Sequence, residues 1–226
     1  MNVLLLPGWG MKSDVFTPLI EALQLNDVTI VEWEHMRDVN HFFTKAKEAL
    51  HAPSLVIGWS LGSLVALQLG MHPYVTHLVC IGGTSRFTTS ENYHAGWHAR
   101  VVERMKVQVV RQTNKTIQSF IDMLWGEKEA RPFPHMHDRT SDLLLGLDYL
   151  LATDVRDQLQ QMDVPLLLIH GEQDRICPPQ AAQYIYERTR NCTLKLLRNV
   201  GHAPHVTQPY ACAHVIQTWL GGGSND

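Results

Sequence analysis

The sequence predicts an α/β fold with a mostly parallel, doubly wound sheet of about six strands. Apolar runs of strand length occur at residues 3–6, 28–33, 54–59, 77–82, 165–170 and 193–197. Several of these runs are continuous rather than alternating, which is typical of strands buried on both faces of a parallel sheet. Helix-like segments lie between them, at about 14–25, 41–51, 61–72, 179–190 and 207–219. This alternation of strand and helix is the pattern of a doubly wound sheet.

One interval, residues 86–150, interrupts that alternation. It contains no clear strand but three helix-like stretches: RVVERMKVQVVRQ, KTIQSFIDMLWG and TSDLLLGLDYLL. We interpret it as a helical cap inserted over the carboxyl edge of the sheet, the edge at which open α/β folds bind ligands. The core then comprises residues 1–85 and 151–220. The glycine-rich tail, 221–226, is expected to be disordered.

Composition excludes several classes of function. The 226 residues suit one compact domain with an insertion, and a net charge of -3 argues against a nucleic-acid partner. No apolar run approaches the roughly 20 residues that span a bilayer, and the apolar N-terminus lacks the basic start of a signal peptide. The four cysteines show no CxxC spacing, which suits free thiols in a reducing compartment. We therefore expect a cytoplasmic monomer that does not bind membranes.

The segment Gly58-Trp59-Ser60-Leu61-Gly62 lies where a predicted strand meets a predicted helix. A G-x-S-x-G sequence at such a junction is typical of a nucleophile elbow, a strained turn that projects the serine from the end of the strand. Flanking glycines leave room for that turn. The alternative is a purely structural glycine turn. We favour the elbow, with Ser60 as the nucleophile.

An elbow serine requires a base and an acid, which follow it in the order Ser, Asp/Glu, His in this kind of fold. Asp174 follows the apolar strand at 165–170, and His202 follows the last predicted strand. Their placement after successive strands predicts a catalytic triad of Ser60, Asp174 and His202. Glu172 and His205 are the fallback acid and base. Taken singly, Asp174 and His202 are equally compatible with a turn residue and a surface histidine.

The loop after the first strand, LLLPGWG, supplies the remaining part of the predicted site. A glycine-flanked loop there can direct the N–H of Trp9 toward an oxyanion, together with the N–H of Leu61. The alternative is a turn with a packing tryptophan. His135 and His137 are not accompanied by a known metal-ligand pattern, so we predict no metal site and no cofactor.

The motifs PGWG, GWSLGSLVA, HGEQD and GHAPHVTQP resemble the α/β-hydrolase superfamily over the whole chain. Within it, GWG, Trp59, His202-Ala203-Pro204 and the run GLDYLLATDVRDQLQQMDVPLLLIHG are similar to the pimeloyl-[acyl-carrier protein] methyl ester esterases of biotin synthesis. This resemblance implies a carboxylesterase that cleaves the methyl ester of a pimeloyl group carried on an acyl-carrier protein. It implies the same triad and the same oxyanion pair.

The resemblance also implies an acyl channel lined by the cap stretch Phe120, Ile121, Asp122, Met123 and Leu124. The sequence departs from the family at Pro7, where the family has a histidine, and it begins at what would be the third strand of the family. Residues 86–115 carry six basic side chains against two acidic ones, namely Arg86, Arg100, Arg104, Lys106, Arg111 and Lys115 against Glu91 and Glu103. This excess indicates either a docking face for an acidic carrier protein or a solvated helix face.

Two alternative functions remain open at this point. The superfamily uses the same triad for other chemistry, so a lyase of menaquinone synthesis or a C–C bond hydrolase is the enzymatic alternative. A non-catalytic receptor with a hydrolase fold is the alternative from another class.

Overall fold

A computed structural model describes residues 1–127, 129 and 134–222. Its centre is a six-stranded sheet in the order β2-β1-β3-β4-β5-β6, and every neighbouring pair of strands is parallel. The strands are β1 (Asn2–Leu6), β2 (Val28–Ile30), β3 (Ser54–Trp59), β4 (Val75–Ile81), β5 (Leu166–Gly171) and β6 (Cys192–Leu197). The predicted six-stranded α/β fold is confirmed.

The hydrophobic patterns of the strands follow their positions in the sheet. The inner strands β3 and β5 are buried along their whole length, which explains their continuous apolar runs. The edge strand β6 alternates between partly buried and exposed residues, and its sequence accordingly includes Lys195. The core of the protein therefore lies on both faces of β1, β3, β4 and β5.

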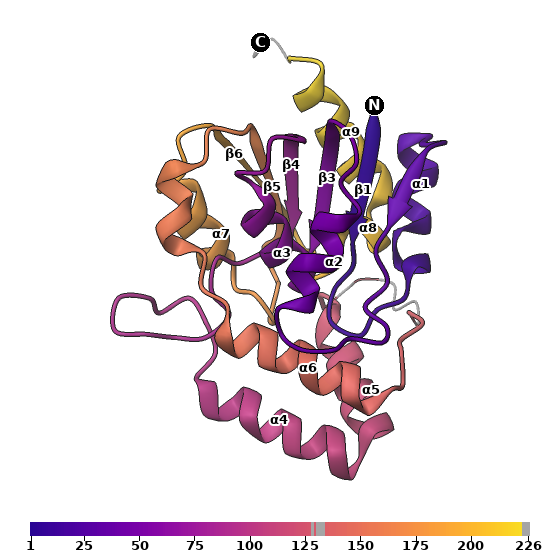
Figure 1. The fold of residues 1–226 in the computed structure, drawn as a ribbon, viewed down its shortest axis with the longest axis vertical. Helices are drawn as coiled ribbons and strands as arrows, with labels where there is room; N and C mark the ends of the chain where they lie inside the picture. The colour runs from indigo at the N-terminus through magenta and orange to yellow at the C-terminus, as the bar shows by residue number, and fades with distance from the viewer. Residues whose placement is uncertain (128, 130–133, 223–226) are drawn as a thin grey trace.

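Helices cover both faces of this sheet (Figure 1). On one face α1 (Thr17–Leu23) packs against α9 (Pro209–Leu220), and on the other α2 (His41–Glu48) packs against α3 (Leu61–Leu69). The helix α7 (Pro179–Tyr186) packs against β5 and β6. Short elements complete the core, namely the 3-10 helices η1 (Ser13–Phe16) and η2 (Arg156–Gln161) and the helix α8 (Pro204–Thr207).

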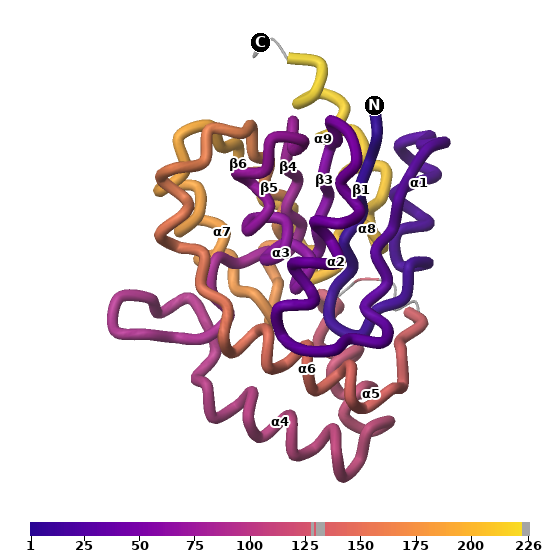
Figure 2. Tube along the Cα trace, in the orientation of Figure 1, coloured from indigo at the N-terminus to yellow at the C-terminus, as the bar shows by residue number. Residues whose placement is uncertain are grey.

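Three further helices lie beyond the carboxyl ends of the strands (Figure 1). They are α4 (Ala99–Arg111), α5 (Thr113–Leu124) and α6 (Thr140–Ala152), and α4 packs against both of the others. The chain between β4 and α4 forms an extended loop beside the sheet, with an isolated bridge between Thr88 and Trp97 (Figure 2). We keep the name cap for residues 86–150, whose division from the core stays a prediction.

Three other features bear on the sequence predictions. None of the four cysteines, all in the described part of the chain, forms a disulfide. Over the residues that the structure covers, no helix combines the length and the apolar character needed to cross a bilayer. The tail predicted to be disordered falls mainly on residues 223–226, which lie outside the described residues.

Candidate active site

Ser60 lies between β3 and α3 with φ 56° and ψ -117°, a strained conformation for a residue other than glycine. The turn is tight because backbone segments meet on both sides of it. A Cβ added to Gly58 would lie 2.3 Å from the carbonyl oxygen of Gly62, and one added to Gly62 would lie 2.0 Å from that of Leu6. Both positions therefore require glycine. This is the backbone geometry of an elbow rather than of a relaxed turn.

Hydrogen bonds fix this turn to the sheet. The N–H of Ser60 donates to the carbonyl oxygen of Ile81 at 3.0 Å. The hydroxyl of Ser63 lies 2.7 Å from the carbonyl oxygen of Gly58 and 3.1 Å from that of Ile81. Ser60 is thus held at the end of β3, next to the end of β4, while 7% of its surface stays exposed.

Asp174 follows β5 and is buried. One of its carboxylate oxygens, Oδ1, accepts hydrogen bonds from the N–H groups of Ile176 at 2.8 Å and Cys177 at 2.9 Å. The other, Oδ2, lies 2.7 Å from Nδ1 of His202. Cys177 contacts Asp174 through its backbone N–H. Burial raises the pKa of its thiol well above the ordinary value, so the thiol stays protonated and adds no charge to the site. The structure therefore brings the predicted acid and the predicted base together.

A second histidine, His170 at the end of β5, shares the same carboxylate. Its Nε2 lies 3.2 Å from Oδ2 of Asp174 and 2.7 Å from the carbonyl oxygen of Cys177. Burial alone would raise the pKa of Asp174, but the charge of His202 and the hydrogen bonds of His170 and His202 outweigh it. The pKa of Asp174 is therefore held well below its usual range. Sequence reasoning did not identify His170, whose one signal is a polar residue ending an apolar strand.

His202 is fully buried and is positioned by its backbone. Its N–H donates to the carbonyl oxygen of Leu124 at 2.7 Å, and its own carbonyl oxygen accepts from the indole N–H of Trp59 at 2.8 Å. Because Nδ1 faces Asp174, Nε2 is the free ring nitrogen, and it has no hydrogen-bond partner among the described residues. Nε2 of His202 therefore forms no hydrogen bond with the hydroxyl of Ser60 in this structure. Catalytic hydrogen bonds often tighten only when substrate is bound.

The loop after β1 passes directly beside the elbow, since a Cβ added to Gly8 would lie 3.3 Å from Cβ of Ser60. The indole N–H of Trp33 donates to the carbonyl oxygen of Pro7 at 2.8 Å, and that of Trp9 donates to the carbonyl oxygen of Leu143, also at 2.8 Å. The loop that contains Pro7 is thus supported by two indole side chains.

The backbone N–H groups of Trp9 and Leu61 are the predicted oxyanion donors. Neither donates to any acceptor within the described parts of the chain. The N–H of Leu61 belongs to the first turn of α3, where backbone donors have no partner within the helix. Free donors of this kind are what binding an oxyanion requires.

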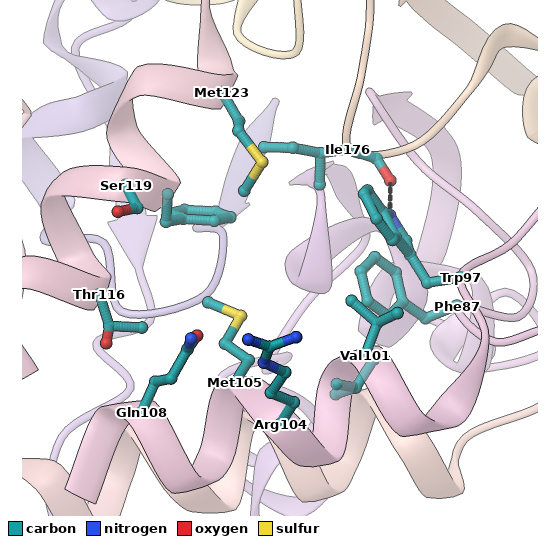
Figure 3. A pocket seen from close by; sticks show the side chains of 12 residues that line it. Phe87, Trp97, Val101, Arg104, Met105, Gln108, Thr116, Ser119, Met123 and Ile176 are labelled. Carbon is teal, nitrogen blue, oxygen red and sulfur yellow. Dashed lines mark hydrogen bonds between the residues drawn. The ribbon is translucent and has the colours of Figure 1, made fainter. Parts of the chain in front are cut away.

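The residues of the predicted acyl-channel stretch, 120–124, lie in different surroundings, and their role in binding an acyl chain stays a prediction. Phe120 and Met123 line a pocket between α4 and α5, and Figure 3 shows Met123 at this pocket. The ring of Phe120 meets that of Trp9 edge-on, with ring centroids 5.0 Å apart. Ile121 and Leu124 are buried in the core instead, outside the pocket wall. Asp122 is exposed and accepts a hydrogen bond from Gln118. A helix presents only one face to a cavity, so consecutive residues cannot all line it.

Among the described residues, the remaining candidates form no hydrogen bond with Asp174 or His202. Glu172 is exposed, whereas His205 is fully buried and packs against the rings of Trp59 and Phe16. His137 lies between two carboxylates, 3.2 Å from that of Glu32 and 2.7 Å from that of Glu34. No group of three or more histidine, cysteine or acidic residues suited to a metal ion is found among the described residues.

Comparison with known proteins identifies the family. The family model described as "Serine aminopeptidase, S33", an α/β-hydrolase family, matches residues 33–208, more than half of the chain. The chain belongs to this α/β-hydrolase family.

Relatives of this α/β hydrolase carry a more specific name. A protein of Vibrio vulnificus named "Pimeloyl-[acyl-carrier protein] methyl ester esterase" is 26% identical over 97% of the chain and 94% of its own length. One of the same name from Neisseria meningitidis serogroup B is 29% identical over 98% of the chain and 93% of its own length.

A solved structure, an esterase from Exiguobacterium antarcticum, superimposes with a TM-score of 0.87 at 17% identity. It covers 98% of this chain and 92% of that protein, and it supports the hydrolase fold.

Proposed function

We propose that this hydrolase is a serine carboxylesterase that cleaves a methyl ester through an acyl-enzyme. One observation carries the proposal: a strained serine lies at the same sheet edge as a buried histidine whose Nδ1 is held by a carboxylate. With Nδ1 bound to Asp174 at 2.7 Å, the unpartnered Nε2 of His202 is the nitrogen that can accept a proton. That tautomer is the one a base acting on Ser60 requires.

In the proposed reaction, Oγ of Ser60 attacks the ester carbonyl while Nε2 of His202 takes its proton. The N–H groups of Trp9 and Leu61 donate to the developing oxyanion, and Asp174 stabilises the imidazolium. The methanol oxygen then leaves with the proton from His202. A water molecule attacks the acyl-enzyme by the same route and releases the acid, regenerating Ser60. No cofactor takes part in this scheme.

We further propose that the acyl group is pimeloyl carried on an acyl-carrier protein, in the cytoplasm, with the enzyme as a monomer. Support comes from the names of the relatives, which cover nearly the whole chain. Part of the basic excess of the cap is internally paired, because Lys106 contacts Asp148 and Arg86 contacts Asp154. An acidic carrier protein would therefore meet the remaining basic residues, Arg100, Arg104, Arg111 and Lys115.

The proposed mechanism is tested with a fluorophosphonate probe, which labels activated serines covalently. We expect labelling of the wild-type protein and of Ser141→Ala, a control at an exposed serine, and no labelling of Ser60→Ala. Equal labelling of Ser60→Ala, or none of the wild type, would remove the serine-hydrolase proposal. In the latter case a non-catalytic receptor becomes the better explanation.

The substrate is tested separately with pimeloyl-carrier-protein methyl ester, by following the methanol released. Hydrolysis of this ester, and restored growth without biotin in a strain that lacks its own esterase, is the expected result. A protein that is labelled by the probe but leaves this ester intact would keep the mechanism and lose the substrate. The lyase and C–C hydrolase alternatives would then be examined.

A further inference from the structure

The turn that presents the backbone N–H of Trp9 packs against the cap. Gly10, the residue that follows Trp9, has φ 66°. A Cβ added to Gly10 would lie 2.7 Å from side-chain carbons of both Met136 and Leu143. The indole N–H of Trp9 also donates to the carbonyl oxygen of Leu143 at 2.8 Å. The position of this turn therefore depends on cap residues that lie far from it in the sequence.

The cap segment 135–137 pairs with the chain that continues from this turn. The N–H of His137 donates to the carbonyl oxygen of Gly10 at 2.7 Å, and the N–H of Lys12 donates to that of His135 at 3.1 Å. These two hydrogen bonds flank an isolated antiparallel bridge. The pairing begins one residue after the predicted oxyanion donor, so a displacement of this cap segment would displace the donor as well.

The side chain of His137 attaches the cap segment to the core. It is buried, with its Nδ1 2.7 Å from Oε1 of Glu34 and its Nε2 3.2 Å from Oε2 of Glu32. An ionised carboxylate only accepts hydrogen bonds, so a ring that bonds to both glutamates donates from both nitrogens, as an imidazolium does. Charge-assisted hydrogen bonds of this kind are about twice as strong as neutral ones. The ring is therefore clamped between two residues of the core.

The stretch that carries these two glutamates also holds the start of the oxyanion loop. Trp33 lies between them in the sequence, and its indole N–H donates to the carbonyl oxygen of Pro7 at 2.8 Å. The ammonium of Lys45, on α2, donates to the carbonyl oxygens of both glutamates, at 2.5 and 3.0 Å. One short stretch of the core thus holds the start of the loop through Trp33, and through His137 it holds the cap segment that pairs with the end of the loop.

We propose that His137 is a positioning residue for the oxyanion site. Clamped between Glu32 and Glu34, it fixes the cap segment 135–137 against the loop after β1 and keeps the N–H of Trp9 directed toward the oxyanion. The oxyanion site is then complete only while this cap segment lies in place on the core. The catalytic role rests on the proposed esterase function, whereas the clamp itself does not.

The clamp is tested first, without catalysis, by backbone amide hydrogen exchange at pH 6, below the ordinary histidine pKa of about 6.5. We expect His137→Leu to speed exchange of the Lys12 N–H at least about tenfold, because two hydrogen bonds to charged groups are lost. Glu34→Gln should speed it about two- to fivefold, as for a solvent-exposed ion pair. The N–H of Ser60, bonded to Ile81, is the internal reference and should not change. Unchanged exchange of Lys12 in both variants would overturn the clamp.

The catalytic role is tested by kinetics on a soluble methyl ester. Loss of an oxyanion donor costs about 10²–10³-fold in kcat, so displacing one in His137→Leu should cost about ten- to hundredfold, with KM nearly unchanged. Glu34→Gln should lower kcat about two- to fivefold. An alkyl trifluoromethyl ketone, which Ser60 converts into a tetrahedral oxyanion, should lose affinity by the same factor as kcat/KM. His137→Gln keeps one side-chain N–H donor and should recover part of the lost kcat.

His135→Gln is the matched control, because it changes an exposed histidine of the same cap segment. It should leave both Lys12 exchange and kcat unchanged. Equal losses of kcat for His135→Gln and His137→Leu, or a loss of kcat with unchanged affinity for the ketone, would overturn the positioning role. If His137→Leu does not fold, Glu34→Gln makes the same test from the exposed side of the clamp. A wild type that hydrolyses no ester would remove the proposed function, and with it the catalytic role, while Lys12 exchange would still decide the clamp.

Discussion

The carboxyl edge of the sheet and the cap above it are built on different physical principles. At the sheet edge, backbone hydrogen bonds and tight glycine contacts fix Ser60 and Asp174 in the turns that follow the buried strands β3 and β5. In the cap, the pocket between α4 and α5 has walls of long side chains such as Met105 and Met123. If the proposed function is right, the difference teaches that the reacting groups lie where backbone contacts fix them, and that the substrate meets the long side chains of the cap.

His202 is the exception, because both regions hold it. Its carbonyl oxygen is bound by Trp59 of the sheet, whereas its N–H donates to Leu124 at the end of the cap helix α5. Glu129 strengthens the second link, since its carboxylate accepts from the N–H groups of Gly126 at 2.5 Å and Gly201 at 2.8 Å. A shift of α5 would therefore move the histidine loop.

The largest expected effect is at the rigid edge, with Asp174→Asn. An amide that donates to Nδ1 would favour the wrong tautomer of His202, so we expect kcat to fall about 10⁴-fold while the fold is retained. Steady-state kinetics and thermal unfolding measure the two properties. Glu172→Gln is the control at the exposed neighbouring acid and should leave kcat unchanged. A large fall in kcat for Glu172→Gln with no change for Asp174→Asn would identify Glu172 as the acid instead.

A smaller effect is expected at the link between cap and edge, with Glu129→Gln. The variant weakens the hydrogen bonds to Gly126 and Gly201, so the loop that carries His202 loses part of its support. Displacement of a catalytic group by about 1 Å costs up to about 100-fold in rate, and we expect a fall of this order in kcat with little change in KM. Kinetics on a soluble ester measure this.

The control for Glu129→Gln is Glu127→Gln, a change of the same kind at an exposed residue close by. An unchanged kcat in the Glu129 variant would show that the sheet alone positions His202. A marked fall in melting temperature together with the fall in kcat would indicate a general loss of stability instead.

Much of the rigid region could be predicted from the sequence because its signals are local. Continuous apolar runs identify buried strands, and Gly58-x-Ser60-x-Gly62 identifies a strained turn from residues that are adjacent in the chain. The indole of Trp59 binds the backbone of His202, and that contact joins residues far apart in the sequence. No local sequence pattern predicts this contact. The same is true of the contact between the ring of His170 and the carboxylate of Asp174.

The surroundings of individual cap residues could not be predicted from the sequence for a related reason. Its three helices could be read from the sequence, but which face of α5 meets the pocket depends on how α4 packs against it. That is why Phe120 and Met123 line the pocket while Ile121, predicted with them, lies in the core. Similarly, a count of basic residues cannot show that Lys106 is paired, while Arg104 has no ion-pair partner among the described residues.

The next effect concerns stability, at the buried His205 below the edge. Both ring nitrogens of His205 lack hydrogen-bond partners in the described chain, and the ring packs 4.7 Å from that of Trp59. Unsatisfied buried polar groups cost about 1–3 kcal/mol, so His205→Phe should raise the free energy of unfolding by about 1–2 kcal/mol at pH 7.5. Urea unfolding measures it. A destabilised variant would show that the cavity does not accept phenylalanine.

The same variant should change how stability depends on pH. Burial, together with the charge of His202, lowers the pKa of His205 to about 3, whereas in the unfolded chain it is near its ordinary 6.5. Between these values the unfolded chain binds the extra proton, so His205 removes stability as pH falls below about 6.5, by up to about 1.4 kcal/mol per pH unit. Between pH 7.5 and pH 5 the free energy of unfolding should fall less steeply with decreasing pH in His205→Phe than in the wild type. The same slope in both proteins would contradict this.

The smallest effect is expected inside the cap, at the ion pair that joins α4 to α6. The ammonium of Lys106 lies 2.5 Å from the carboxylate of Asp148, and this hydrogen bond, together with the charges of Asp148 and Glu103, raises the pKa of Lys106. Both side chains are partly exposed, so Asp148→Asn should cost only about 0.5 kcal/mol of stability at low salt. Because a raised lysine pKa stabilises the folded state only while the lysine is charged, the difference from wild type should vanish well above pH 10. Urea unfolding at neutral and alkaline pH measures both. If kcat of Asp148→Asn on a soluble ester also stays unchanged, weakening the contact between α4 and α6 does not disturb His202. The cap and the sheet edge are then coupled through the hydrogen bonds of Glu129.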